Sequence, residues 1–334
     1  MGSMTLLETR GVSKSFGGNH VLRGVDFDVR RGEVHALVGE NGAGKSTLTK
    51  IIAGVHHPDA GTVVFDGRKT EFRDPGSAVR AGISTVYQEL NLIPYLDCAS
   101  NIALGREPRT ALVMHQSEIR AQAAEALKEI GSHASPTTLV SSLSTGERQL
   151  VEIAKALAAD ARLIIMDEPT AALSSGEIER LHQSIHRLTD RGIAVIYISH
   201  KLDEVFRIAD RLSVMRDGRL LTTLEPSEFD RDQVVSMMLG RDLESERREI
   251  ESQLTGESRF AGEPVLKVSG LSVPGKVRDV SFTVHAGEIL GMAGLVGAGR
   301  TETVRALVGL ERISEGRIEL GSAPYRPRSP ARAI

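Results

Sequence analysis

A short glycine-rich segment has the residue types and spacing of a phosphate-binding loop. The segment GENGAGKS at 39–46 follows an apolar run and precedes a helical pattern at 46–53, which is the context that the motif G-x-x-x-x-G-K-[ST] requires. Glycines let several backbone N–H groups turn inward, and the start of the helix adds its positive end. We expect Lys45 to reach the β- and γ-phosphates of a nucleotide and the Ser46 hydroxyl to bind Mg²⁺. The expected phosphate site comprises Gly39, Glu40, Asn41, Gly42, Ala43, Gly44, Lys45, Ser46 and Thr47.

Two carboxylates follow another apolar run. The segment RLIIMD at 162–167 has the pattern of a buried strand and leads directly into Asp167 and Glu168. Ligands of α/β proteins bind at the carboxyl ends of the strands. We therefore expect Asp167 to support Mg²⁺ and Glu168 to orient or deprotonate the water that attacks the γ-phosphate. An acid pair after a strand is more often a helix cap or a surface feature, but the upstream phosphate loop favours the catalytic interpretation.

The elements that would position these residues alternate along the chain. Apolar, β-branched runs separated by helical patterns are typical of a mainly parallel sheet covered by helices on both faces, so we expect an α/β fold. The runs lie at 34–38, 83–87, 162–167 and 194–199. Helical patterns dominate 112–158, which predicts a helical subdomain at about 95–160. Asp217-Gly218 separates two alternating segments at 211–224 and predicts a hairpin.

The sequence also repeats itself. Residues 25–47 align without a gap at an offset of 255 with residues 280–302, so the chain carries two copies of one domain. We expect a first domain at 4–240, a solvated linker rich in Glu, Arg and Ser at 241–262, and the N-terminal part of a second domain at 263–334. The second copy stops well before the repeat is complete, which predicts a truncated chain.

The second copy departs from the first at its phosphate loop. Arg300 stands where the first copy has Lys45, and a planar guanidinium cannot place a compact ammonium between two phosphates. The second copy is also shorter before its loop and has no counterpart of Phe16. We expect a degenerate site that binds nucleotide weakly or without hydrolysis. Its residues are Gly294, Gly299, Arg300 and Thr301.

Composition limits the classes of protein that remain. The 334 residues include 41 Lys and Arg against 44 Asp and Glu, and the net charge of −3 gives no general reason to expect nucleic-acid binding. Cys98 is the only cysteine, so no internal disulfide can form, and a reducing cytosol is expected. No run reaches the roughly 18 to 20 apolar residues that a membrane-spanning helix needs. A role at a membrane would therefore require docking onto other subunits.

A further segment resembles a family signature. Residues 143–149, LSTGERQ, resemble the LSGGQ signature of the ATP-binding-cassette family and lie shortly before the Asp-Glu strand. The resemblance covers nearly all of the first copy. It implies that Ser144 and the Gly146 backbone bind the γ-phosphate presented by a facing domain. Ser144 and Glu147 also fit a helix capping box, and the two interpretations are compatible because the cap aims the N–H groups.

The resemblance extends to other single residues. Gln88 is similar to the family's glutamine that contacts Mg²⁺ and the attacking water, and His200 is similar to its switch histidine at the γ-phosphate. Residues 171–174 resemble the loop that crosses the dimer interface, and Phe16 holds the place of the aromatic that stacks on adenine. As isolated residues these would be a polar loop residue, a structural histidine and a core aromatic.

The resemblance implies a fold and a function. The fold is a P-loop NTPase with a RecA-like parallel core, an antiparallel β subdomain and a helical subdomain, the second copy being partial. The doubled layout is most similar to the ATPases of ribose, galactose, xylose and arabinose importers. It implies hydrolysis of ATP with Mg²⁺, the nucleotide being sandwiched between one phosphate loop and the opposite signature. The isolated chain is expected to bind ATP and to hydrolyse it weakly unless two first cassettes dimerise.

The implied partners are transmembrane permease subunits, a second cassette and, indirectly, an extracytoplasmic sugar-binding protein. The implied location is the cytoplasmic face of the cell membrane. Two other classes of protein share some of these features. A soluble double-cassette ATPase acting on ribosomes or nucleic acid would be expected to carry two intact phosphate loops or long basic inserts. A phosphoryl-transfer kinase would share the phosphate loop but gives residues 143–149 no role.

Overall fold

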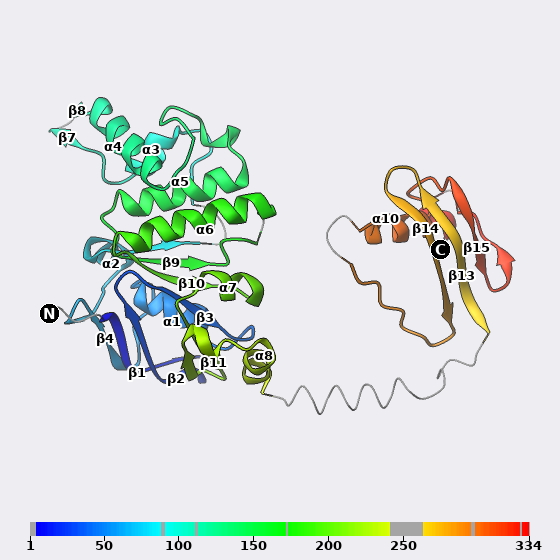
Figure 1. Cartoon of the computed structure of the whole chain (residues 1–334), viewed down its shortest axis with the longest axis horizontal. Coiled ribbons are helices and arrows are strands. Elements are labelled where there is room, and N and C mark those ends of the chain that lie inside the picture. The colour runs from blue at the N-terminus through cyan, green and yellow to red at the C-terminus, as the bar shows by residue number, and fades with distance from the viewer. Residues whose placement is uncertain are drawn as a thin grey trace. The chain divides into compact units, whose positions relative to one another are not determined.

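The computed structural model describes residues 5–87, 91–110, 113–171, 173–240, 263–294, 298–327 and 329–333. The chain divides into two compact units, Met1–Leu243 and Glu244–Ile334, each of which is described by itself (Figure 1). The linker expected at 241–262 lies outside the described residues.

A six-stranded sheet forms the centre of the first unit, in the order β12-β11-β3-β10-β9-β6. Its strands are β3 (Val34–Val38), β6 (Ile83–Val86), β9 (Leu163–Asp167), β10 (Ala194–Ile198), β11 (Arg211–Arg216) and β12 (Arg219–Leu224). All neighbours are parallel except β12, which pairs antiparallel with β11 across the Asp217-Gly218 turn. The four predicted strands and the predicted hairpin are therefore confirmed. Every residue of β3 and β10 is buried because both faces of the sheet are covered.

A second, antiparallel sheet packs on one side of this centre. Its strands are β1 (Thr5–Phe16), β2 (Asn19–Arg30), β4 (Ala60–Phe65) and β5 (Arg68–Thr70), in the order β2-β1-β4-β5. Helix α1 (Lys45–Ile52) lies within the same hydrophobic core. That core joins Phe27 and Phe65 of the antiparallel sheet to Leu48 of the helix and to Leu37 and Ile165 of the parallel sheet. The phosphate loop is thus supported from both sheets.

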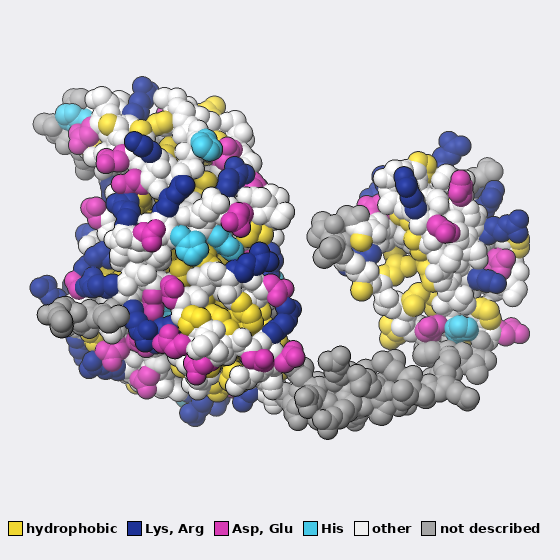
Figure 2. Space-filling model, in the orientation of Figure 1, with side chains coloured by type: hydrophobic (Ala, Val, Ile, Leu, Met, Phe, Trp, Pro, Cys, Tyr) yellow, Lys and Arg dark blue, Asp and Glu magenta, His cyan; other side chains and the backbone are white. Residues whose placement is uncertain are grey.

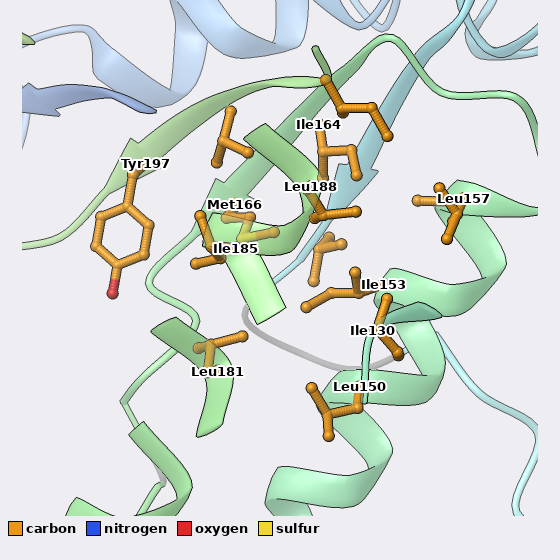
Figure 3. Close-up of a cluster of buried hydrophobic side chains, with 14 of the residues drawn as sticks. Ile130, Leu150, Ile153, Leu157, Ile164, Met166, Leu181, Ile185, Leu188 and Tyr197 are labelled. Carbon is orange, nitrogen blue, oxygen red and sulfur yellow. The ribbon is translucent and has the colours of Figure 1, made fainter. Parts of the chain in front are cut away.

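Helices cover the other face. They are α3 (Cys98–Ala103), α4 (Gln116–Glu129), α5 (Thr145–Leu157), α6 (Ser175–Asp190), α7 (Leu202–Ile208) and α8 (Arg231–Leu239). Helix α2 (Pro75–Ala81) instead contributes Ala78 to the core shared with the antiparallel sheet. Short elements complete this unit: β7 (Arg109–Thr110), β8 (Val113–Met114), and the 3-10 turns η1 (Val140–Ser142) and η2 (Pro226–Glu228). The helical region expected at about 95–160 contains α3, α4 and α5. Side chains of α5, α6 and β9 share one buried cluster, including Leu150, Ile153, Ile185, Leu188 and Ile164 (Figure 3).

The second unit repeats the antiparallel sheet of the first. Its strands run in the order β14-β13-β15-β16, the same arrangement as β2-β1-β4-β5. They are β13 (Pro264–Val273), β14 (Val277–His285), β15 (Glu315–Leu320) and β16 (Ala323–Pro324), and the helices are α10 (Arg300–Leu307) and α11 (Pro330–Ala333). Helix α10 keeps the 255-residue offset from α1 at both ends. The internal repeat is therefore a repeat of structure as well as of sequence.

One segment of the second unit aligns with the first unit in sequence but differs from it in structure. Residues 289–293 align with β3 but form no strand, and Ile289 is 96% exposed. In the first unit β3 lies between β10 and β11, which come from much later in the chain. No strand of that kind is present among the described residues of the second unit. A central strand without neighbours has unpaired backbone groups on both edges, so it does not form.

The surface of the first unit carries charges of both signs. Lys and Arg side chains are interspersed with Asp and Glu side chains across the face shown in Figure 2. This mixture agrees with the small net charge of the sequence and offers no broad basic face in that view. Among the described helices, none is long and apolar enough to cross a membrane.

Candidate nucleotide-binding site

The loop between β3 and α1 is shaped by two glycines. Gly39 has φ 156°, and a Cβ there would lie 2.2 Å from the carbonyl oxygen of Met215. Gly44 has φ 102°, and a Cβ there would lie 2.7 Å from Leu22 Cδ2. Neither position admits a side chain without displacing a neighbour. The backbone therefore makes the narrow turn that a phosphate-binding loop needs before its helix.

The loop is also fixed by its own lysine and by the β11–β12 turn. The Lys45 ammonium donates hydrogen bonds to the carbonyl oxygens of Gly39 at 2.7 Å and Glu40 at 2.9 Å. The Gly218 N–H donates to the Ala43 carbonyl at 3.2 Å. These contacts hold the Lys45 ammonium at the mouth of the loop. There it can replace its hydrogen bonds to carbonyl oxygens with stronger ones to phosphate oxygens.

The phosphate loop and the acid pair line one hollow. Its residues are Val21, Asn41, Gly42, Gly44, Lys45, Ser46, Thr47, Asp167, Glu168 and Ile198. The geometry follows from the sheet order, because β3 and β9 flank β10 and all three end at the same edge. Gly39, Glu40 and Ala43 belong to the same loop but do not line the hollow. Val21 and Ile198 were not expected from the sequence, where nothing distinguishes them from core residues.

The charges in this hollow are incompletely balanced. Burial lowers the pKa of the Lys45 ammonium, against the opposing effect of Asp167 and Glu168. Burial also raises the pKa of the Asp167 carboxyl, and Glu168 adds to that rise while Lys45 and Lys50 oppose it. Two neighbouring acids in a partly desolvated site would be stabilised by a further cation.

The donor set of the hollow fits Mg²⁺. Asp167 supplies a carboxylate and Ser46 a hydroxyl, and both are oxygen ligands. Across the described residues no cluster of three or more His, Cys, Asp or Glu side chains is placed to hold a metal. Mg²⁺ commonly binds through one or two protein oxygens together with substrate phosphates, so this sparse set is adequate. Gln88, the other expected ligand, lies outside the described residues.

Glu168 and His200 meet at the edge of the hollow. Glu168 adopts φ 48°, and its N–H donates to the Ile198 carbonyl at 2.9 Å. His200 follows β10 by two residues and places its Nδ1 3.1 Å from Glu168 Oε1. A left-handed conformation is uncommon for glutamate and costs free energy, and such residues concentrate at functional sites. The structure thus brings His200 to the acid that the sequence indicated as the catalytic group.

The signature residues lie at the start of α5. Ser144 is the N-cap, its Oγ accepts from the Glu147 N–H at 3.2 Å, and Glu147 Oε2 accepts from the Ser144 N–H at 3.0 Å. The expected capping box is confirmed. Ser144 and Gly146 do not line the hollow that contains Lys45. Both instead donate hydrogen bonds to Glu177 of α6, a residue that the sequence reasoning missed although Ser174 and Glu177 also have capping-box spacing.

Phe16 and the segment 171–174 were also expected near the nucleotide. Phe16 ends β1, is 42% exposed, and makes an edge contact with His56 at 5.2 Å between ring centroids. It does not line the hollow. Of residues 171–174, Ala172 lies outside the described residues.

The second unit keeps the glycine conformations of the first at its degenerate loop. Gly294 has φ 155° and Gly299 has φ 81°, as the N-cap of α10. Arg300 and Thr301 line a shallow hollow with Met292, Val304 and Arg305. Among the described residues of the second unit, no strand corresponds to β9, which carries the acids in the first unit.

A parallel sheet whose central strand leads through a glycine loop into a helix, with an acid pair on the next strand but one, defines a P-loop NTPase. The model of the ABC transporter family matches residues 22–171 and 277–333, more than half of the chain. The chain belongs to the ABC transporter family.

Relatives with known names are similar along almost the whole chain. The ribose import ATP-binding protein RbsA 3 of Rubrobacter xylanophilus is 48% identical over 98% of this chain and 65% of the relative. RbsA of Geobacillus kaustophilus is 46% identical over 98% of this chain and 66% of the relative. A putative ribose/galactose/methyl galactoside import ATP-binding protein of Burkholderia ambifaria is 45% identical, over 98% of this chain and 63% of the relative. The chain thus spans somewhat less than two thirds of their length.

Solved structures show the same fold. An ATP-binding cassette of an ABC transporter in its ADP conformation has a TM-score of 0.60 and 26% identity, and the similarity covers 76% of this chain and 100% of that one. A dimeric cassette in a post-hydrolysis state bound to ADP and Pi has a TM-score of 0.57 and 28% identity, covering 67% of this chain and 100% of that one.

Proposed function

We propose that this chain is the ATP-binding and ATP-hydrolysing subunit of a membrane importer for monosaccharides. The observation that carries the proposal is the single hollow in which Lys45, Ser46, Asp167 and Glu168 meet. The named relatives support the sugar class, because their names refer to import of ribose or of ribose, galactose and methyl galactoside. The transported sugar itself would be chosen by partner proteins.

The residues expected at the phosphates have separate roles in this proposal. The loop amides and Lys45 bind the β- and γ-phosphates, while Ser46, Asp167 and Gln88 hold Mg²⁺, which when bound offsets the charge of the phosphates. Glu168 orients a water for attack and accepts its proton. His200 contacts the γ-phosphate and is oriented by its bond to Glu168.

The site is completed by a second cassette. Ser144 and Gly146 of a facing cassette would bind the γ-phosphate from the other side, and Phe16 would stack on adenine. The existence of dimeric cassettes among the similar structures supports this arrangement. Closure of the pair would then move permease subunits at the cytoplasmic face of the membrane, with an extracytoplasmic sugar-binding protein delivering the cargo.

The proposal is tested by nucleotide binding and turnover of the purified chain. Wild-type protein should bind ATP in a Mg²⁺-dependent manner, and Lys45→Ala should lose that binding. Glu168→Gln should keep the binding and lose turnover. Lys69→Ala, which removes an exposed lysine of β5, is the matched control and should behave as wild type. Equal turnover in wild type and Glu168→Gln would contradict the role assigned to Glu168.

A further inference from the structure

One carboxylate oxygen of Glu177 lies at the N-terminus of α5. Its Oε1 accepts hydrogen bonds from the Gly146 N–H at 3.0 Å and from the Ser144 hydroxyl at 3.1 Å. These are the two donors that the proposed function assigns to the γ-phosphate of a facing cassette. The anion-binding end of the signature helix is therefore occupied by an anion from the same cassette.

The other carboxylate oxygen of Glu177 caps its own helix. Its Oε2 accepts from the Ser174 N–H at 3.0 Å and from the Ser174 hydroxyl at 2.7 Å. One side chain thus joins the first turns of α5 and α6 through four hydrogen bonds. These bonds, led by the one from the Ser174 backbone, lower the pKa of Glu177 to about 2. The carboxylate is therefore charged at any pH where the protein works.

The contact depends on a glycine and on two anchored helices. A Cβ at Gly146 would lie 2.6 Å from both Cγ and Oε1 of Glu177, so the carboxylate fits only because residue 146 has no side chain. Both helices are held by the buried cluster that Leu150 and Ile153 of α5 share with Leu181 and Ile185 of α6 (Figure 3). The carboxylate is therefore presented to the signature by packed elements rather than by a loop.

We propose that Glu177 is an internal substitute for the γ-phosphate, which holds the signature donors while no facing nucleotide is present and must release them when the ATP sandwich closes. The inference rests on the proposed function. Two anions cannot bind the same two donors at about 3 Å, because each N–H or O–H has one hydrogen to donate and the like charges repel. Closure therefore exchanges the carboxylate for phosphate at Gly146.

The exchange also links two parts of the interface. When Oε1 leaves Ser144 and Gly146, Oε2 remains bound to Ser174, which ends the segment 171–174. Binding of a phosphate to Ser144 and Gly146 would therefore move the carboxylate that also binds Ser174, the residue before α6. Glu177 acts as a positioning residue, since it works through the signature donors and does not contact the nucleotide.

The first test measures ATP-driven self-association of the full chain by sedimentation, in a Glu168→Gln background that prevents turnover. Replacing Glu177 by Gln keeps the size of the side chain and removes its charge. The ATP concentration for half-maximal association should then fall roughly tenfold, the difference between charged and neutral hydrogen-bond acceptors. Glu179→Gln makes the same charge change at an exposed position of α6 and should leave the midpoint unchanged. Equal midpoints for the Glu177 and Glu179 variants would overturn the inference.

A second test examines the contact without association. In nucleotide-free full chain, the Gly146 amide should exchange its hydrogen roughly tenfold faster in Glu177→Gln, and in Glu177→Ala, than in wild type. Unchanged protection in variants that keep the wild-type circular dichroism would overturn the inference even if association were never observed. Failure of wild type to bind Mg²⁺-ATP would instead contradict the proposed function, so the two failures are distinguishable.

Discussion

The imidazole of His200 and the carboxylate of Glu168 are hydrogen-bonded, with Nδ1 3.1 Å from Oε1. They come from neighbouring parallel strands, where Ile198 of β10 is in register with Asp167 of β9. A register shift of one residue would direct the following side chains elsewhere. The register of β9 and β10 therefore determines that the two side chains meet. The exposed imidazole of His200 is oriented by one hydrogen bond to Glu168, the proposed base.

The pair predicts the effect of removing the imidazole. His200→Ala should lower ATP turnover by roughly 100-fold, the usual size of a lost acid–base or orienting group, while Mg²⁺-ATP affinity changes little because the phosphate loop is intact. Steady-state turnover and equilibrium binding check both parts. His186→Ala, an exposed histidine of α6, should have wild-type turnover. Wild-type turnover in His200→Ala would contradict the role of the pair.

Asp167 illustrates a conflict between function and stability. Its carboxylate lies in a partly desolvated hollow next to Glu168, and no hydrogen bond from another side chain compensates it among the described contacts. Asp167→Asn should therefore raise the midpoint of thermal unfolding by roughly 2 °C at pH 7 without nucleotide, and should abolish Mg²⁺-dependent binding of ATP. Calorimetry of both proteins checks the first part. Asp190→Asn, at the exposed end of α6, serves as control, and a less stable Asp167→Asn protein would contradict the argument.

Arg211 links the six-stranded sheet of the first unit to its four-stranded antiparallel sheet. From β11 it donates two hydrogen bonds to Asp28 of β2, at 2.8 and 3.0 Å, and one to the buried Glu33 at 3.4 Å. Arg211→Met should lower the free energy of unfolding by about 3 kcal/mol, because the buried Glu33 loses its arginine partner and Asp28 loses both of its hydrogen bonds from Arg211. Urea unfolding measures this loss. Arg219→Met, which replaces an exposed arginine of β12, should cost little by comparison.

The same network predicts a dependence on pH. The hydrogen bond from Arg211 lowers the pKa of the Asp28 carboxyl below its ordinary 3.8. A lowered folded-state pKa stabilises the protein above pH 3.8, and that contribution is lost as the pH falls through the lower value. The stability difference between wild type and Arg211→Met should therefore narrow below about pH 3.8. A difference that widens on acidification would contradict this assignment.

The second unit predicts the number of nucleotides bound. Arg300 replaces the lysine, and residues 289–293 form no strand at the foot of its loop. Titration calorimetry of the full chain should therefore give one Mg²⁺-ATP per chain, and Lys45→Ala should leave no tight site. Arg300→Lys should not create a second one, because the strand is still absent from that unit. Two equivalent sites in the wild-type chain would contradict this view.

Much of the site could be predicted because its signals are local. The loop at 39–46 and the acids Asp167 and Glu168 each follow a recognisable strand, and parallel strands end at one edge of a sheet. Their meeting in one hollow needed no further information. By contrast, the bond between Glu177 and Gly146 depends on how closely α5 and α6 pack. The spacing of Glu177 from Ser174 predicts a helix cap only, since sequence patterns do not report contacts between helices.

The failure of residues 289–293 to form a strand has a similar cause. The segment aligns with β3, but a central parallel strand forms only when its neighbours are present on both sides. For Phe16, position in the sequence does not establish the contact that its ring makes. Its place in the chain suggested adenine stacking, yet its exposed ring contacts His56. Stacking on adenine therefore remains a prediction for Phe16.

The order of strands in the central sheet has a consequence for biosynthesis. Strand β3, which leads into the phosphate loop, lies between β10 and β11 in the sheet. Its backbone N–H and C=O groups therefore lack their strand partners until residues 194–216 have left the ribosome. Contacts so distant along the polypeptide form slowly and late. A nascent cassette should therefore be unable to bind nucleotide until most of its first unit has been made, and during that interval its exposed apolar strands are prone to aggregation.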